Sequence, residues 1–190
     1  MRRLLPLLLI ATLVSCGSPR NSAPEPVETP VMRWDFHPES EAWTNATFNA
    51  LEAHGSPLLS FVPSDIATYC PAYSEAPRQD RAAFWTGLFS ALAKHESTWN
   101  PRAVGGGGLW YGLTQIDPRS ADWYGCRVTS GEALKDGPAN LSCAVRIATY
   151  QVLRRGTVTR GMRDWGPFHS EAKRADMASW TREQAYCQDG

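Results

Sequence analysis

Residues 79–96, which read QDRAAFWTGLFSALAKHE, decide the fold. Phe84, Leu88 and Leu92 recur at four-residue spacing and form an apolar stripe of the kind that a helix buries. The next step of four lands on Glu96, which places a carboxyl on the buried face of the last helical turn. Because burial penalises the charged form, we expect the pKa of Glu96 to be raised. The alternative interpretation is a helix-end glutamate that faces solvent.

Apolar residues at helical spacing recur in three further segments, 40–54, 140–155 and 171–180. No run of alternating apolar and polar residues is long enough to predict a sheet. The sequence allows, without requiring, a short β-hairpin between residues 105 and 116. The expected fold is therefore mainly α, with one helical domain over residues 34–190.

The first residues resemble the export signal of a bacterial lipoprotein. Arg2 and Arg3 precede a nearly unbroken apolar run over residues 4–14, which is too short to span a bilayer but suits a secretory signal. The run ends in LVSC at residues 13–16, which resembles a lipobox and implies cleavage before Cys16 and lipidation of that residue. The alternative is an ordinary signal peptide with an incidental cysteine.

This resemblance implies a signal peptide over residues 1–15 and a lipid-anchored, Pro- and Ser-rich tether over residues 16–33. Gly17 rather than aspartate follows the cysteine, which favours the outer membrane in such proteins. The expected location is therefore the periplasm, with the chain held at the outer membrane by Cys16. An extended tether of about 15 residues reaches ~45 Å at ~3.1 Å per residue.

Four further cysteines, Cys70, Cys126, Cys143 and Cys187, suit two disulfides in an exported protein. Three pairings are open, and we prefer Cys126–Cys143 with Cys70–Cys187 because the first closes a short loop around a turn-rich segment. None of these cysteines lies at zinc-ligand spacing, so neither a metal site nor a cofactor is expected. The formal net charge of zero gives no argument for nucleic-acid binding.

Two segments resemble the soluble lytic transglycosylase (SLT) domain of the lysozyme-like superfamily: ESTWNP at 96–101, which begins with Glu96, and GLTQI at 112–116. That family shows Glu-Ser, an aromatic residue, Asn-Pro, a glycine-rich stretch and Gly-Leu-x-Gln. Asn140, in NLSCA at 140–144, resembles the third family motif, in which an asparagine opens a helix. The resemblance implies a lysozyme-like helical domain that acts on the glycan strands of peptidoglycan.

The resemblance also implies roles for individual residues. Glu96 would be the sole catalytic acid and base, cleaving the bond between N-acetylmuramic acid and N-acetylglucosamine and leaving a 1,6-anhydro sugar. Gly112 and Gln115 would line the sugar cleft, and Ser97 would position Glu96 or the substrate. Asn140 would contribute to the cleft or brace it. Two other functions stay open: a muramidase that hydrolyses the same bond, and a lipoprotein that binds peptidoglycan without cleaving it.

The chain departs from the family pattern at two places. Asp117 follows the second motif, where it either caps a helix that begins at Pro118 or supplies the second carboxylate of a hydrolase. In the fourth motif, Trp165 stands near the position of the family tyrosine and fills it without a hydroxyl, and the resemblance makes it a candidate contact for the substrate. The fine adjustment of Glu96 therefore rests on different chemistry in this chain.

Four aromatic residues surround the motifs, Trp99, Trp110, Tyr111 and Trp123. A place in the core is the first interpretation for each of them. Trp110 and Tyr111, which lie beside glycines, are the best candidates for stacking on sugar. His95 is expected at the surface or the rim, because it points about 100° away from Glu96 around the helix.

Overall fold

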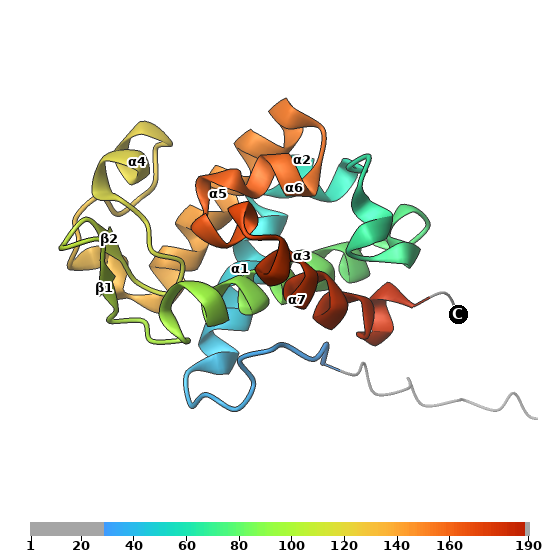
Figure 1. The fold of residues 1–190 in the computed structure, drawn as a ribbon, viewed down its shortest axis with the longest axis horizontal. Coiled ribbons are helices and arrows are strands. Elements are labelled where there is room, and N and C mark those ends of the chain that lie inside the picture. Colours follow the sequence, from blue (N-terminus) through green and yellow to red (C-terminus); the bar gives the residue numbers. More distant parts are fainter. Residues whose placement is uncertain (1–28, 189–190) are drawn as a thin grey trace, which may run out of the picture.

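Four long helices build the core of the protein, for which a computed structural model describes residues 29–188. They are α1 (Ser40–Glu52), α3 (Arg78–Ser97), α5 (Gly137–Arg155) and α7 (Glu171–Arg182). In α3 every residue from Ala82 to Ala93 is buried, so the helix is covered on all sides and not only along its apolar stripe. Helices α1 and α7 pack against α3, and α1 also packs against α5 (Figure 1).

Short elements connect these helices in the described part of the chain. The short α-helices are α2 (Ser56–Ser60), α4 (Pro118–Trp123) and α6 (Val158–Gly161). The 3-10 turns are η1 (Ile66–Thr68), η2 (Pro71–Ser74), η3 (Ala133–Lys135), η4 (Met162–Asp164), η5 (Gly166–His169) and η6 (Ala185–Cys187). The strands β1 (Val104–Gly105) and β2 (Trp110–Tyr111) form one antiparallel hairpin, which confirms the mainly α fold with a minimal hairpin.

The hairpin and α4 lie together at one side of the molecule, at the left of Figure 1. Val104 pairs with Tyr111, and a further bridge joins Tyr111 to Ile116. These contacts fold residues 104–116 back on themselves at the end of α3. The motif that follows Glu96 is therefore held in a small lobe beside the helical core.

Two helix starts differ from the sequence-based expectation, and both carry a proline in the first turn. Helix α5 begins at Gly137 rather than Asn140, because the Asp136 side chain caps it by accepting from the Ala139 N–H at 2.8 Å. Helix α2 was not among the helices expected from the sequence, and it begins at Ser56 with Pro57 in its first turn. Proline suits this position because it lacks only an N–H that no helical carbonyl would accept.

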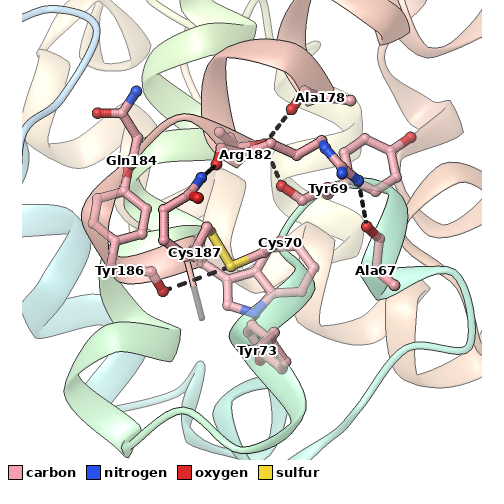
Figure 2. The surroundings of a disulfide bond; sticks show 12 residues. Ala67, Tyr69, Cys70, Tyr73, Ala178, Arg182, Gln184, Tyr186 and Cys187 are labelled. Carbon is pink, nitrogen blue, oxygen red and sulfur yellow. Dashed lines mark hydrogen bonds between the residues drawn. A yellow bond between two sulfur atoms is a disulfide. The ribbon is translucent and has the colours of Figure 1, made fainter. Parts of the chain in front are cut away.

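Both disulfides have the preferred pairing. Cys70 is bonded to Cys187 and joins the start of η2 to η6, close to the carboxyl end of the chain (Figure 2). Cys126 is bonded to Cys143 and joins the segment after α4 to α5. The second bond therefore attaches the lobe that contains α4 to the helical core.

The folded domain begins earlier than the expected boundary at residue 34. Met32 is almost fully buried, and Arg33 forms an ion pair with Asp176 of α7. The last residues assigned to the tether therefore belong to the domain. The expected signal peptide over residues 1–15 and the expected lipidation site at Cys16 lie outside the described residues. Within the described part, none of the helices has the length and apolar character needed to cross a membrane.

Candidate active site

Glu96 lies in the last turn of α3 with its carboxyl turned inward. Its Oε1 is buried and has no hydrogen-bond partner among the described residues. Burial raises the pKa of Glu96 to about 7, while the Lys173 ammonium and the backbone of Gly166 act in the opposite direction. The carboxyl therefore holds a proton close to neutral pH, as expected from the apolar stripe.

Ser97 joins the end of α3 to the second motif. Its hydroxyl donates to the Leu113 carbonyl at 2.9 Å and to the Ala93 carbonyl at 3.2 Å. Thr98 then ends the helix in the left-handed conformation, with φ of 52°. Ser97 therefore holds the loop of the second motif against the end of α3.

The segment 112–116 makes a close turn that only a glycine can open. Gly112 has φ of 81°, and a Cβ there would collide with the Leu134 carbonyl and the Asn140 amide. Gln115 is also left-handed, and its Nε2 donates to the carbonyls of Gly112 at 2.9 Å and Ala103 at 3.2 Å. The amide of Gln115 thus holds the turn together while its side chain lines the hollow described below.

Asn140 braces this turn from the helical core and does not line the hollow. It is fully buried, and its Nδ2 donates to the carbonyls of Tyr111 at 2.9 Å and Leu134 at 3.0 Å. Its Oδ1 accepts from the backbone N–H and the hydroxyl of Thr114. Both ends of the amide are saturated, so Asn140 fixes the loop and leaves nothing for a ligand.

Of the three aromatic residues expected to contact the sugar, one is exposed and two use their polar atoms in hydrogen bonds within the protein. Trp110 is 47% exposed, so it remains a candidate for stacking on sugar. The Tyr111 hydroxyl donates to the Gly108 carbonyl within the hairpin. Trp165 is 3% exposed, and its indole N–H donates to the Thr114 carbonyl at 2.9 Å. Trp165 therefore supports the second motif from behind and offers almost no surface to a sugar.

A small hollow of about 80 Å³ lies against this motif. It is lined by Trp110, Gln115, Ile116, Asp117, Ser120, Tyr124, Ile147, Asp164 and Trp165. Trp165 immediately precedes Gly166, whose backbone acts on the Glu96 carboxyl. Glu96 itself is not among the residues that line this hollow.

Asp117 is a helix cap, as the preferred interpretation has it. Its carboxylate accepts from the Arg119 backbone N–H at 2.8 Å and pairs with the Arg119 guanidinium at 2.8 Å. These contacts with Arg119 lower the pKa of Asp117. The carboxylate is therefore ionised and occupied with Arg119.

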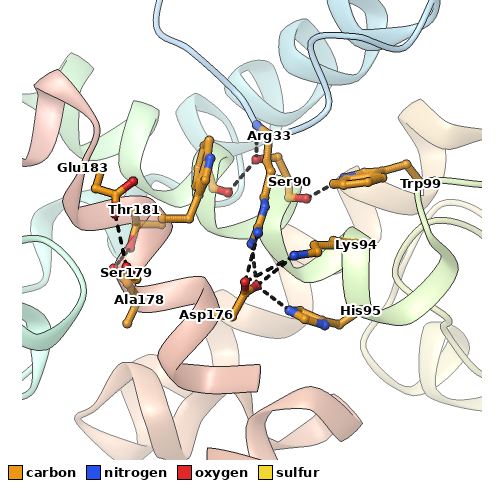
Figure 3. Close-up of polar contacts among 12 residues, drawn as sticks. Arg33, Ser90, Lys94, His95, Trp99, Asp176, Ala178, Ser179, Thr181 and Glu183 are labelled. Atoms are coloured by element: carbon orange, nitrogen blue, oxygen red, sulfur yellow. Dashed lines mark hydrogen bonds and ion pairs between the residues drawn. The ribbon is translucent and has the colours of Figure 1, made fainter. Parts of the chain in front are cut away.

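Other polar residues near α3 serve the fold. The His95 Nε2 donates to the Asp176 carboxylate of α7 at 2.7 Å (Figure 3). In the described part of the chain, no group of three or more His, Cys, Asp or Glu side chains could hold a metal ion.

Sequence reasoning missed Lys173 and Gly166 as neighbours of Glu96. Both depend on how α7 and the segment before it pack against α3, and nothing in the spacing of residues links them to position 96. The Gly-Pro step at 166–167, noted in the fourth motif, was the one available signal for Gly166.

Comparison with known proteins agrees with this geometry. Residues 75–156 match the family model of the transglycosylase SLT domain. Among solved structures, a wild-type form and two variants of Bd0314 DslA each superpose with a TM-score of 0.75 at 26% identity, over 83% of this chain and 98% of that chain. No curated protein matches the chain.

An SLT domain implies peptidoglycan cleavage of the lytic transglycosylase type, with glycan strands as the substrate. The match spans both motifs, from before α3 to the end of α5. Residues 75–156 of this chain are therefore similar to a transglycosylase SLT domain, and the chain has a lysozyme-like fold.

Proposed function

We propose that this protein cleaves the β-1,4 bond between N-acetylmuramic acid and N-acetylglucosamine in peptidoglycan and leaves a 1,6-anhydromuramyl end. The observation that carries the proposal is the Glu96 carboxyl, with a buried, unpartnered Oε1 and a pKa of about 7. A glycosidic oxygen leaves as an alcohol only if it receives a proton, and a carboxyl that keeps its proton near neutral pH can supply one.

The reaction then uses the same residue twice. The protonated Glu96 carboxyl gives its proton to the leaving glycosidic oxygen as the bond to C1 breaks. The resulting carboxylate takes the proton of the muramyl C6 hydroxyl, whose oxygen forms the new bond to C1. The proton gained in the second step restores Glu96, so no second carboxylate and no water are consumed.

Hydrolysis is the second candidate, because Asp117 lines the hollow next to Gln115. A hydrolase of this type uses a second carboxylate to activate water or to attack the sugar. The contacts of Asp117 with Arg119 favour the cap over this role. Asp117→Asn, which retains a capping side chain, is therefore expected to leave the anhydro product unchanged.

Digestion of purified sacculi followed by mass spectrometry of the soluble products tests the proposal. Anhydromuramyl ends are expected, and Glu96→Gln is expected to fold and to release no products. Reducing ends would identify a hydrolase, and strands that are bound but intact would identify a binding protein. Cleavage by Glu96→Gln at the normal rate would remove Glu96 from its proposed role.

We also propose that the mature chain is anchored in the outer membrane through lipidated Cys16, which places the domain in the periplasm beside its substrate. The apolar run and LVSC sequence at residues 4–16 support this location. Cys16→Ser is expected to release the protein into the soluble fraction, whereas the unchanged chain sediments with outer membranes. A soluble, unlipidated wild-type protein would contradict the anchor.

A further inference from the structure

A pocket of about 540 Å³ lies between α1 and α5, and its lining has no residue in common with the hollow at Gln115. The two helices pack against each other (Figure 1), and residues 126–128 of the loop after α4 complete the lining. The volume lies in the range of about 300–1,000 Å³ that is usual for ligand sites. We call this site the α1–α5 pocket.

Short side chains form much of the wall of this pocket. Ala46, Ala50 and Ala53 recur at spacings of four and three residues and so lie on one face of α1. Ala139 and Ser142 follow at a spacing of three residues at the start of α5. Because none of these side chains extends beyond a methyl or a hydroxyl group, the backbone of a ligand can approach both helices closely. The wall therefore suits a ligand with small apolar groups, such as the methyl of an alanine side chain.

Two arginines give the pocket a positive charge that none of its lining residues balances. Arg127 and Arg146 both line it, whereas no Asp or Glu does. Neither arginine takes part in the ion pairs formed among residues 29–188. The disulfide between Cys126 and Cys143 attaches the loop that carries Arg127 to α5, so this loop is held beside the pocket before any ligand binds. Guanidinium groups are planar donors that match a carboxylate, so the pocket favours a carboxylate ligand.

The same pocket offers hydrogen-bonding groups that suit a peptide. His54 of α1 donates from Nε2 to the Ser142 carbonyl of α5 at 2.9 Å. Burial lowers the pKa of His54, the hydrogen bond to Ser142 acts in the opposite direction, and the Arg146 guanidinium lowers the pKa further. The imidazole is therefore neutral at pH 7, and its Nδ1 is an acceptor for an N–H group. Asn49 adds an amide to the lining.

We propose that the α1–α5 pocket binds a short acidic peptide with small side chains, with a carboxylate paired to Arg127 and Arg146 and methyl groups against the alanines. Peptides of this composition, with alanine and free carboxylates, are attached to the glycan strands of peptidoglycan, and we infer that they are the occupant. This choice of occupant rests on the proposed function. The pocket then holds the domain on the cell wall through the peptides, at a site separate from the hollow beside the second motif.

Calorimetry with peptides that an amidase has released from sacculi tests the pocket without any glycan to cleave. Arg127→Gln and Arg146→Gln are each expected to weaken binding about tenfold, because each removes a charged donor to the carboxylate. Arg154→Gln is the matched control, since it removes the same charge from an exposed position of α5 outside the pocket. It is expected to stay within about twofold of the parent, because solvent screens a charge that does not contact the ligand.

Two further measurements separate a shaped site from attraction by charge alone. Ala46→Leu fills the pocket without changing any charge and is expected to weaken binding about tenfold. Tetraglutamate, which carries carboxylates but no methyl side chains, is expected to bind at least about tenfold more weakly than the sacculus peptides. Equal binding of tetraglutamate would overturn the proposal. An equal loss in Arg154→Gln and Arg146→Gln, or full binding by Ala46→Leu, would do the same.

NMR spectra of the protein titrated with the same peptides locate the site. The backbone amide signals of residues 46–54 and 138–146 are expected to shift, whereas shifts confined to residues 112–117 would place the peptide in the hollow at Gln115 and overturn the proposal. A protein that binds the peptides in this pocket but releases no products from sacculi would refute the proposed cleavage and leave the pocket standing. Cleavage of sacculi by a protein that binds none of these peptides would overturn the pocket and leave the cleavage standing.

Discussion

Two carboxyl groups near the end of α3 lie in opposite surroundings. Asp176 contacts the Arg33 guanidinium at 2.6 Å, the His95 ring at 2.7 Å and the Lys94 ammonium at 3.2 Å (Figure 3). The hydrogen bond from Arg33, followed by those from His95 and Lys94, holds the pKa of the Asp176 carboxyl well below its usual range. Glu96, the neighbour of His95 along the chain, has a buried oxygen without a partner and a pKa of about 7.

At the end of α3, the residue that stabilises the fold, His95, is thus the direct neighbour of the residue proposed for the chemistry, Glu96. Consecutive helical residues point about 100° apart, so the two side chains meet different groups of α7: His95 contacts Asp176, whereas Lys173 acts on Glu96. The side of His95 ties the first residues of the domain to α7 through Asp176. On the side of Glu96, burial of a carboxyl with one unpartnered oxygen costs folding free energy and raises its pKa, as is usual at catalytic sites.

The largest effect is expected when the proton donor of the Glu96 side is removed. Glu96→Gln is expected to lower the rate of sacculus cleavage by about 10²–10⁴-fold, the range for loss of a general acid. The amide is isosteric, so near-ultraviolet circular dichroism should remain unchanged. Release of soluble muropeptides over time measures the rate, and a loss below about threefold would show that another group supplies the proton.

Raising the pH removes the proton of Glu96 without a mutation. Cleavage requires the protonated form of Glu96, whose pKa is about 7. The rate at subsaturating substrate should therefore fall about tenfold per pH unit above 7, and about 100-fold by pH 9. Initial rates on solubilised glycan strands between pH 5 and 9 measure this limb. A flat profile through this range would mean that the acid has a different pKa.

The cost of burying the Glu96 carboxyl should appear in the free energy of unfolding. The folded protein holds the Glu96 proton more tightly than the unfolded chain, so this stability is complete below pH 4.5 and is lost as the pH rises through 7. A shift from 4.5 to about 7 corresponds to about 3 kcal/mol. Glu96→Gln should exceed the parent by up to about that amount at pH 8 and match it near pH 4.5, as measured by urea unfolding.

Asp176→Asn tests the second carboxyl group of the comparison, and its expected effect on stability and cleavage is the smallest of the four. The amide replaces a charged acceptor of Arg33, Lys94 and His95, and we expect a loss of about 1–2 kcal/mol because the partly exposed pairs are screened by water. Cleavage of sacculi should stay within about threefold. A variant that keeps full stability but loses cleavage would show that Asp176 belongs to the chemistry.

The sequence was sufficient for the features that local spacing controls. The apolar stripe of residues 84–92 predicted α3 and the burial of the Glu96 carboxyl, whose Oε1 is enclosed, and the cysteine spacing supported the pairing that the structure contains. Asp117 capped α4 because the Asp-Pro step specifies a helix start locally. The helix and its cap depend on neighbours within a few turns, and the Cys126–Cys143 pairing depends on a short loop and leaves Cys70 and Cys187 for each other.

Features that depend on packing between distant segments were not accessible from the sequence. Trp165 looked like a cleft residue, but its indole N–H is taken by Thr114, which is 51 residues away. Trp123 looked like core, but α4 leaves it on the surface because the helix packs only a short face, with Ala121 buried. The partner of each tryptophan is set by the three-dimensional arrangement of the lobe and not by spacing.

The most direct test of the central claim is a ¹³C NMR titration of the glutamate side-chain carboxyls, with Glu96 assigned by its absence from Glu96→Gln. The predicted result is one carboxyl that titrates with a pKa of about 7. Titration of Glu96 near 4.5, the value for a glutamate in water, would contradict the account, since the residue would then be ionised at neutral pH.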